Sequence, residues 1–67
     1  MTLGTVKFFN SSKGFGFIAP EDGGKDIFVN LSAIQDAGLT SIGEGQKISF
    51  DTQSDTKGIK AHNLKLV

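Results

Sequence analysis

The sequence contains no cysteine, no tryptophan and no tyrosine, and only one histidine and one proline. Without cysteine, disulfides and thiolate metal sites are excluded, and a single histidine cannot build a cluster of imidazole ligands. No apolar run approaches the length of a membrane span, and the N-terminus lacks the basic-then-apolar pattern of a signal peptide. We therefore expect an intracellular protein with no metal, no cofactor, no membrane partner and no small-molecule substrate.

The chain is short and electrically balanced. Its 67 residues suffice for one domain, so residues 1–67 are interpreted as a single unit. A domain of this size buries only about 60% of its unfolded surface, which predicts marginal stability. Seven lysines balance seven Asp and Glu residues. Residues 1–20 nevertheless contain lysines and no acid, so the N-terminal third is locally basic.

Short β-branched and alternating segments, separated by turn residues, predict five strands. Ser32 with Gln35 three positions on resembles a capping box, which predicts one helical turn within a long loop at 31–45. Five short strands favour a closed barrel, because closure removes exposed sheet edges. The predicted fold is all-β, a five-stranded antiparallel Greek-key barrel of the OB type, with strands at 3–10, 15–19, 26–30, 46–52 and 59–66.

The six phenylalanines are the most informative residues, and five of them lie between positions 8 and 28. Neighbouring side chains of a strand face opposite sides, so Phe15 and Phe17 share one face and Ile18 lies on the other. Phe28 likewise shares a face with an acid and an amide, opposite the aliphatic side chains of its strand. These polar neighbours indicate that the face is exposed to solvent. A contiguous exposed apolar surface usually marks an interaction site. Flat rings beside lysines suit stacked bases and phosphates.

The alternation leaves two alternatives open for these rings, namely burial in the core and packing against a second chain. Phe50 shares a face with Ile48 and is predicted to be core. Phe8 and Phe9 are adjacent, so they point opposite ways unless a bulge intervenes, and Val6 in the core would put Phe8 inward. An enzyme is not expected, because a barrel this small fills its interior with side chains and leaves no catalytic pocket.

Three segments resemble the bacterial cold-shock protein family. They are Gly4–Asn10, Lys13–Ile18, which is similar to the first ribonucleoprotein motif of that family, and Ile27–Leu31, which is similar to the second. The resemblance covers essentially the whole chain. It implies a cytoplasmic, five-stranded barrel that binds single-stranded RNA and DNA, with pyrimidine-rich segments preferred. It also implies an RNA chaperone or a regulator of transcription or translation, expected as a monomer with a dimer as the alternative.

Carried over position by position, the resemblance implies a binding surface of rings, lysines and polar side chains. It places Phe8 outward, against simple alternation, and so predicts an irregularity in the first strand. Lysines would neutralise phosphates, and Asn10 and Asp26 would bond base edges, with Asp26 pairing with Lys7 or Lys25 as the alternative. The expected nucleic-acid-binding residues are Lys7, Phe8, Phe9, Asn10, Lys13, Phe15, Phe17, Asp26, Phe28, Asn30, Leu31, Leu39, Lys57 and Lys60.

The sequence departs from the family pattern at several of these positions. The family usually has Trp at position 8, His at 30, Phe at 31 and 39, Pro-Gln at 59–60 and a small residue at 62. A leucine has no π system on which a base can stack, so we hypothesise a weaker or differently tuned binder. His62 is interpreted as a surface residue of the last strand, with a phosphate or base contact as the alternative. At these departing positions this sequence has Phe8, Asn30, Leu31, Leu39, Ile59, Lys60 and His62.

Overall fold

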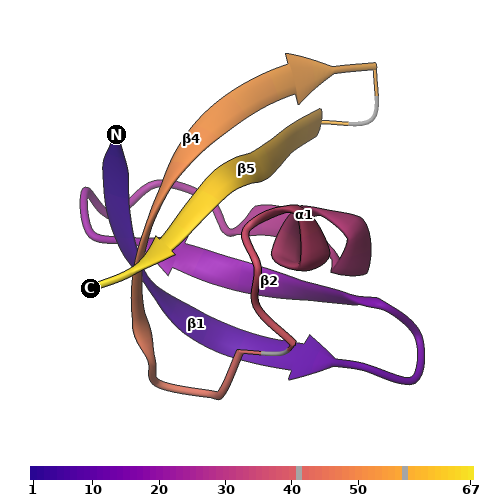
Figure 1. Ribbon diagram of the computed structural model, residues 1–67. Coiled ribbons are helices and arrows are strands. Elements are labelled where there is room, and N and C mark those ends of the chain that lie inside the picture. Colours follow the sequence, from indigo (N-terminus) through magenta and orange to yellow (C-terminus); the bar gives the residue numbers. More distant parts are fainter. Residues whose placement is uncertain (41, 57) are drawn as a thin grey trace.

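The computed structural model describes residues 1–40, 42–56 and 58–67, and their strands close into a five-stranded barrel (Figure 1). The order around the barrel is β1-β2-β3-β5-β4, and β4 returns to pair with β1. This closure confirms the predicted all-β class and architecture. The elements are β1 (Thr2–Asn10), β2 (Phe15–Pro20), β3 (Ile27–Asn30), α1 (Leu31–Asp36), β4 (Lys47–Asp55) and β5 (Gly58–Leu66).

One of the neighbouring strand pairs departs from the expected antiparallel pattern. The pairs β1–β2, β2–β3, β1–β4 and β4–β5 are antiparallel, but β3 pairs with β5 in parallel through Phe28 and Lys60. Parallel strands require a crossover between them, and α1, the following loop and β4 supply it. Figure 1 shows the result, with β4 and β5 side by side as a long hairpin and the two termini on the same side of the barrel.

Aliphatic side chains from every strand and from α1 fill the interior of the barrel. The predicted core residues Ile18, Ile27 and Val29 are buried, and Phe50 has no exposed surface. Full burial of one such side chain contributes about 1.5–3 kcal/mol, so this cluster is the main source of stability. Its members are Val6, Ile18, Ile27, Val29, Ile34, Ile42, Ile48, Phe50, Ala61 and Leu64.

A β-bulge interrupts β1 between Val6 and Phe8. Val6 pairs with Ile18 and Phe8 pairs with Phe17, so Lys7 is an extra residue without a partner in β2. The bulge reverses the alternation, because Val6 is 1% exposed and Phe8, two residues later, is 39% exposed. The irregularity expected in the first strand is thus confirmed.

Gly16 allows β1 and β2 to approach closely beside this bulge. A Cβ atom at Gly16 would lie 2.4 Å from the carbonyl oxygen of Phe8 and 2.7 Å from a ring carbon of Phe9. Both distances are below van der Waals contact, and the first involves backbone that cannot move aside without breaking the strand pair. Only glycine fits at this position of β2.

Helix α1 begins directly after β3 and buries Ile34. Its N-cap is Asn30, whose Oδ1 accepts hydrogen bonds from the backbone N–H of Ala33 at 3.0 Å and from the hydroxyl of Ser32 at 2.9 Å. The predicted cap at Ser32 is therefore wrong by two residues. Asn30 is already extended and has a short side-chain oxygen in reach of the third N–H, as an N-cap requires. No helix in the described ranges is long and apolar enough to cross a membrane.

A second irregularity lies in the β4–β5 hairpin, where the register shifts between Ser49 and Asp51. Asn63 faces this shift with a φ of 55°, a left-handed conformation that asparagine tolerates better than most residues. Its Nδ2 donates to Oδ2 of Asp51 at 2.9 Å. This hydrogen bond favours the carboxylate and holds the pKa of Asp51 below its ordinary value.

The lowered pKa of Asp51 predicts a contribution to stability that acid removes. A carboxyl with a lower pKa in the folded state stabilises the fold above its unfolded pKa, about 4, and loses that effect as pH falls through the folded pKa. We expect Asp51→Asn to be less stable than the parent at neutral pH, with the difference shrinking as the pH falls through the lowered pKa of Asp51. Urea unfolding followed by circular dichroism measures both values, and a difference independent of pH would contradict the assignment.

Candidate nucleic-acid interface

Four phenylalanine rings from three strands contact one another on the outer face of the barrel, and we call this cluster the ring surface. Ring centroids of neighbouring members lie 5.5–6.1 Å apart. Phe15 and Phe28 are nearly parallel at 17°, whereas the other contacts are tilted or edge-on. Each ring is partly exposed, and the face predicted from alternation is therefore an exposed aromatic patch. The members are Phe8, Phe15, Phe17 and Phe28.

Strand register explains why these rings meet. Phe8 pairs with Phe17 and Phe17 pairs with Phe28, so one ring from each of β1, β2 and β3 stands in a single row. Phe15 stands two residues before Phe17 on the same face and contacts all three other rings. Without the bulge at Lys7, Phe8 would point into the core and the row would lose its first ring.

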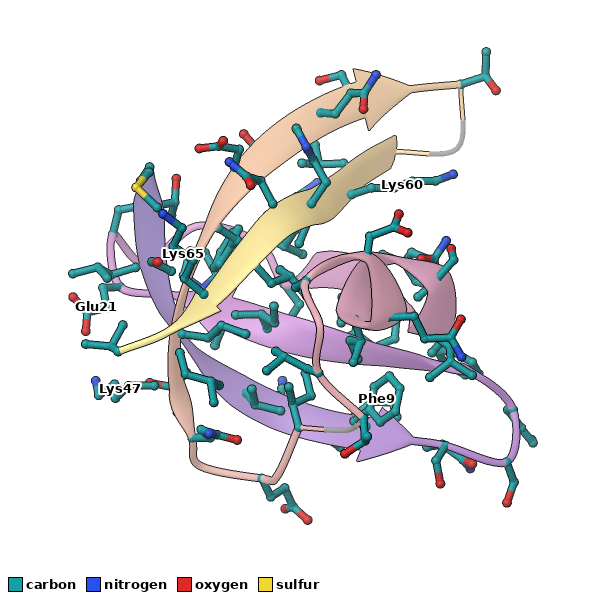
Figure 2. The ribbon with its side chains drawn as sticks, in the orientation of Figure 1. Phe9, Glu21, Lys47, Lys60 and Lys65 are labelled. Atoms are coloured by element: carbon teal, nitrogen blue, oxygen red, sulfur yellow. The ribbon has the colours of Figure 1, made fainter. Side chains whose placement is uncertain are left out.

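Phe9 lies outside the ring surface. It is half-buried and packs against the core cluster, and none of the ring contacts among the described residues involves it. Figure 2 shows its ring at the C-terminal end of β1. Because Phe8 and Phe9 are adjacent, the bulge that exposes one turns the other inward, so the structure supports a packing role for Phe9.

Lys7 and Asp26 form an ion pair next to the ring surface. Nζ of Lys7 lies 3.0 Å from Oδ2 of Asp26, and the two side chains are 61% and 38% exposed. Pairing with Lys7 is one of the two alternatives to a base contact that the sequence analysis named for Asp26. At this exposure an ion pair contributes about 0–1 kcal/mol, so a competing anion can displace Asp26 from Lys7 at low cost.

The β1–β2 turn carries two further expected site residues. Oδ1 of Asn10 accepts from the backbone N–H of Lys13 at 3.0 Å, and the carbonyl of Asn10 accepts from Gly14 at 2.8 Å. Gly14 has a φ of 79°, which closes the turn. Asn10 thus shapes the turn that presents the exposed ammonium of Lys13.

The remaining expected residues occupy different environments. Leu31 is half-buried, and its backbone N–H donates to the carbonyl of Gly14 at 2.8 Å, beside the β1–β2 turn. Leu39 packs against the core cluster, so its side chain serves the fold. Lys60 pairs with Phe28 across the parallel junction and so extends the row of rings onto β5. Lys57 lies outside the described residues.

Gln53 was missed by the sequence reasoning, although it pairs with Lys60 at the end of this row. The predicted fourth strand ended at residue 52, so alternation assigned Gln53 no face, whereas β4 extends to Asp55. The place of Gln53 at the end of the row depends on the parallel β3–β5 pair, which no local pattern encodes.

Comparison with known proteins decides the family. The model of the 'Cold-shock' DNA-binding domain matches residues 2–67. The chain belongs to the cold-shock domain family. It is 55% identical over 67 residues to Cold shock protein CspA of Rhizobium meliloti, with 97% of each chain covered. It is 54% identical over 61 residues to Cold shock-like protein CspE of Escherichia coli, covering 91% of this chain and 88% of the relative.

A third relative shows a comparable level of identity. This cold-shock domain is 50% identical over 64 residues to the Major cold shock protein of Micrococcus luteus, with 96% of both chains covered. Membership of a DNA-binding domain family confirms the expectation of a binding module rather than an enzyme. It also confirms the resemblance drawn from the ribonucleoprotein-like motifs.

Phe50 is buried and Phe8 is partly exposed, so replacing each of them by alanine should lower the free energy of unfolding by different amounts. Phe50→Ala should lower the free energy of unfolding by about 3–5 kcal/mol, because it empties core volume. Phe8→Ala removes a partly exposed ring and should cost about 1 kcal/mol, mainly from lost ring contacts. Denaturant unfolding compares the two, with Phe50→Leu as the milder core change if Phe50→Ala does not fold. Equal costs at positions 8 and 50 would contradict the distinction between core and ring surface.

Proposed function

We propose that this cold-shock domain binds single-stranded RNA and DNA with low sequence specificity by stacking bases on the ring surface. The observation that carries the proposal is the row of partly exposed rings from β1, β2 and β3, flanked by exposed lysines. Stacking contributes about 1–3 kcal/mol per base, so several rings suffice for useful affinity. Every base has a π face, which makes such binding tolerant of sequence.

The angles between the rings favour a single strand over a duplex. Phe8 meets Phe15 at 78° and Phe17 meets Phe28 at 74°, so bases lying on successive rings cannot stay stacked on each other. A flexible single strand can splay its bases in this way, whereas a duplex keeps its base faces stacked and its base edges paired. The same need for flexibility supports a preference for pyrimidine-rich strands, which stack weakly among themselves.

The polar rim supplies phosphate and base-edge contacts. Lys13 on the β1–β2 turn and Lys7 beside Phe8 neutralise phosphates in the bound complex. When a phosphate takes Lys7, the carboxylate of Asp26 is released and can accept a hydrogen bond from a base amino or imino group. Asn10 contacts a base edge through its amino group, because its Oδ1 is engaged with Lys13. With a net charge of zero, affinity depends on these local contacts and not on a long-range field.

A protein that binds only unpaired strands shifts RNA folding toward melted forms by mass action. We therefore propose that this domain acts as an RNA chaperone in the cytoplasm and regulates transcription or translation through the strands it holds. Its membership of the cold-shock family supports this role. We propose a monomer, because a dimer through the ring surface would cover the rings that bind bases.

Binding of a labelled oligothymidylate, followed by fluorescence anisotropy, tests the proposed function. We expect saturable binding by the parent and at least a tenfold loss in Phe15→Ala/Phe17→Ala, since two stacked bases lose about 1–3 kcal/mol each. The slope of log K against log salt should be about −0.7 for each phosphate contact. The label is on the ligand because the chain has no Trp or Tyr.

The matched control is Leu3→Ala/Leu66→Ala, which removes two exposed apolar side chains outside the ring surface. It should bind as the parent does, with circular dichroism unchanged in both variants. The rival function is a protein-interaction module in which the rings pack on a second chain. Absence of binding at low salt, together with a dimer in sedimentation that the Phe15→Ala/Phe17→Ala change dissociates, would establish that rival.

Replacing Leu31 tests whether the domain is a weakened binder. Leu31 lies beside the β1–β2 turn and is half-buried. The residue before it, Asn30, pairs with Phe15, so a ring at position 31 would lie near Phe15. We expect Leu31→Phe to raise oligothymidylate affinity about tenfold, in line with one added stacking contact. Leu39→Phe is the comparison, since Leu39 packs on the core and should give little gain. An unchanged affinity for Leu31→Phe would refute the idea that this leucine weakens binding.

A further inference from the structure

A shallow cleft lies next to the ring surface, between α1 and the β4–β5 hairpin. Its volume is about 200 Å³, below the roughly 300–1,000 Å³ of pockets for drug-sized ligands. Side chains from four elements line it, among them Asn30 at the end of β3, Asp36 at the end of α1, Gln53 on β4, and Lys60 and His62 on β5.

Strand pairing places the cleft beside the ring surface. Phe8, Phe17 and Phe28 are successive partners across β1, β2 and β3, and the next partner is Lys60 on β5. Gln53 on β4 completes the same row. A second link runs through Asn30, which lines the cleft and pairs with Phe15. A strand lying on the rings therefore reaches the cleft within one strand spacing, about 4.8 Å.

The side chains that line the cleft include both hydrogen-bond donors and acceptors. The two lone pairs of Asn30 Oδ1 are engaged by Ala33 and Ser32, so its side chain offers only amino hydrogens to a ligand. Lys60 supplies a cation, and His62 stands two residues further along the same outer face of β5. The carboxylate of Asp36 is the acceptor on the α1 side.

We propose that this cleft is a subsite for the nucleotide that follows the ring-stacked bases. Lys60 and His62 bind its phosphate, Asn30 donates to a base carbonyl, and Asp36 accepts from a base amino group or a ribose hydroxyl. The proposal rests on the proposed function, because the strand enters the cleft from the ring surface. Lys60 and His62 are departures from the family pattern, so the subsite is a property of this chain.

Lys65 is the matched control for Lys60, because it does not line the cleft. Figure 2 shows the two lysines toward opposite ends of β5, with Lys60 at the end near α1. Labelled oligothymidylates of about four to eight nucleotides are titrated against parent, Lys60→Gln, His62→Ala, Lys60→Gln/His62→Ala and the control Lys65→Gln. The shortest strand fills the rings, and a longer one also enters the cleft. Circular dichroism confirms that each variant is folded.

The subsite predicts effects that depend on strand length. We expect His62→Ala to weaken binding of the longer strand about two- to tenfold, as for one lost hydrogen bond, and to leave the shortest strand unaffected. Lys60→Gln should also reduce the salt slope for the longer strand by about 0.7, whereas Lys65→Gln should not.

The outcomes separate the subsite from the proposed function. If the cleft variants lose affinity for the longer strand and keep it for the shortest, the result supports both the ring-surface binding and the cleft subsite. If the longer strand binds the double variant as tightly as the parent, while Phe15→Ala/Phe17→Ala still abolishes binding, the subsite is refuted and the ring surface stands. If neither strand binds the parent, both proposals fail.

Discussion

The exposure of Phe8, the first ring of the ring surface, depends on one extra residue in β1. Lys7 has no partner in β2, and this bulge sends Val6 into the core and Phe8 to the surface, although the two are separated by a single residue. The bulge needs close contact between the strands, and Gly16 makes that contact possible because a side chain would collide with the Phe8 carbonyl. Two small backbone features thus connect the core packing to the ring surface.

The rings also contribute to the stability of the fold that presents them. Each of the four rings contacts at least two others, and such contacts are worth about 0.5–1.5 kcal/mol beyond the area they bury. This mutual packing offsets part of the cost of leaving large apolar groups in water. It also holds the rings at fixed angles before a ligand arrives, which reduces the ordering cost of binding.

Electrostatic contacts in this small domain are local. The net charge is zero, and Lys7 is paired with Asp26 in the free protein. In the proposed complex, a phosphate would replace Asp26 as the partner of Lys7, which limits the gain from that contact but frees the carboxylate of Asp26 for a base. Lys60 gives β5 a cation at the end of the row of rings, so the row passes from aromatic to charged side chains across the parallel junction.

Much of the fold was accessible from the sequence, because the signals are local. Alternation identified the five strands, assigned Phe50 to the core and placed Phe15, Phe17 and Phe28 on an outer face, and the ribonucleoprotein-like motifs indicated the family. The helix cap was misplaced, since Asn30 and Ser32 are both good capping residues and only the backbone at the end of β3 selects the first.

The tertiary structure alone decided which distant residues stand together. The parallel pairing of β3 with β5 places Phe28 beside Lys60 and forms the cleft with α1, although these residues are far apart in the chain. The ion pair between Lys7 and Asp26 likewise depends on where the bulge directs the lysine. The sequence determined the strands and which of their faces are buried or exposed, because side-chain alternation depends only on residues adjacent in the chain. Closure of the barrel determined the site, because contacts between strands depend on register and direction, which no single segment encodes.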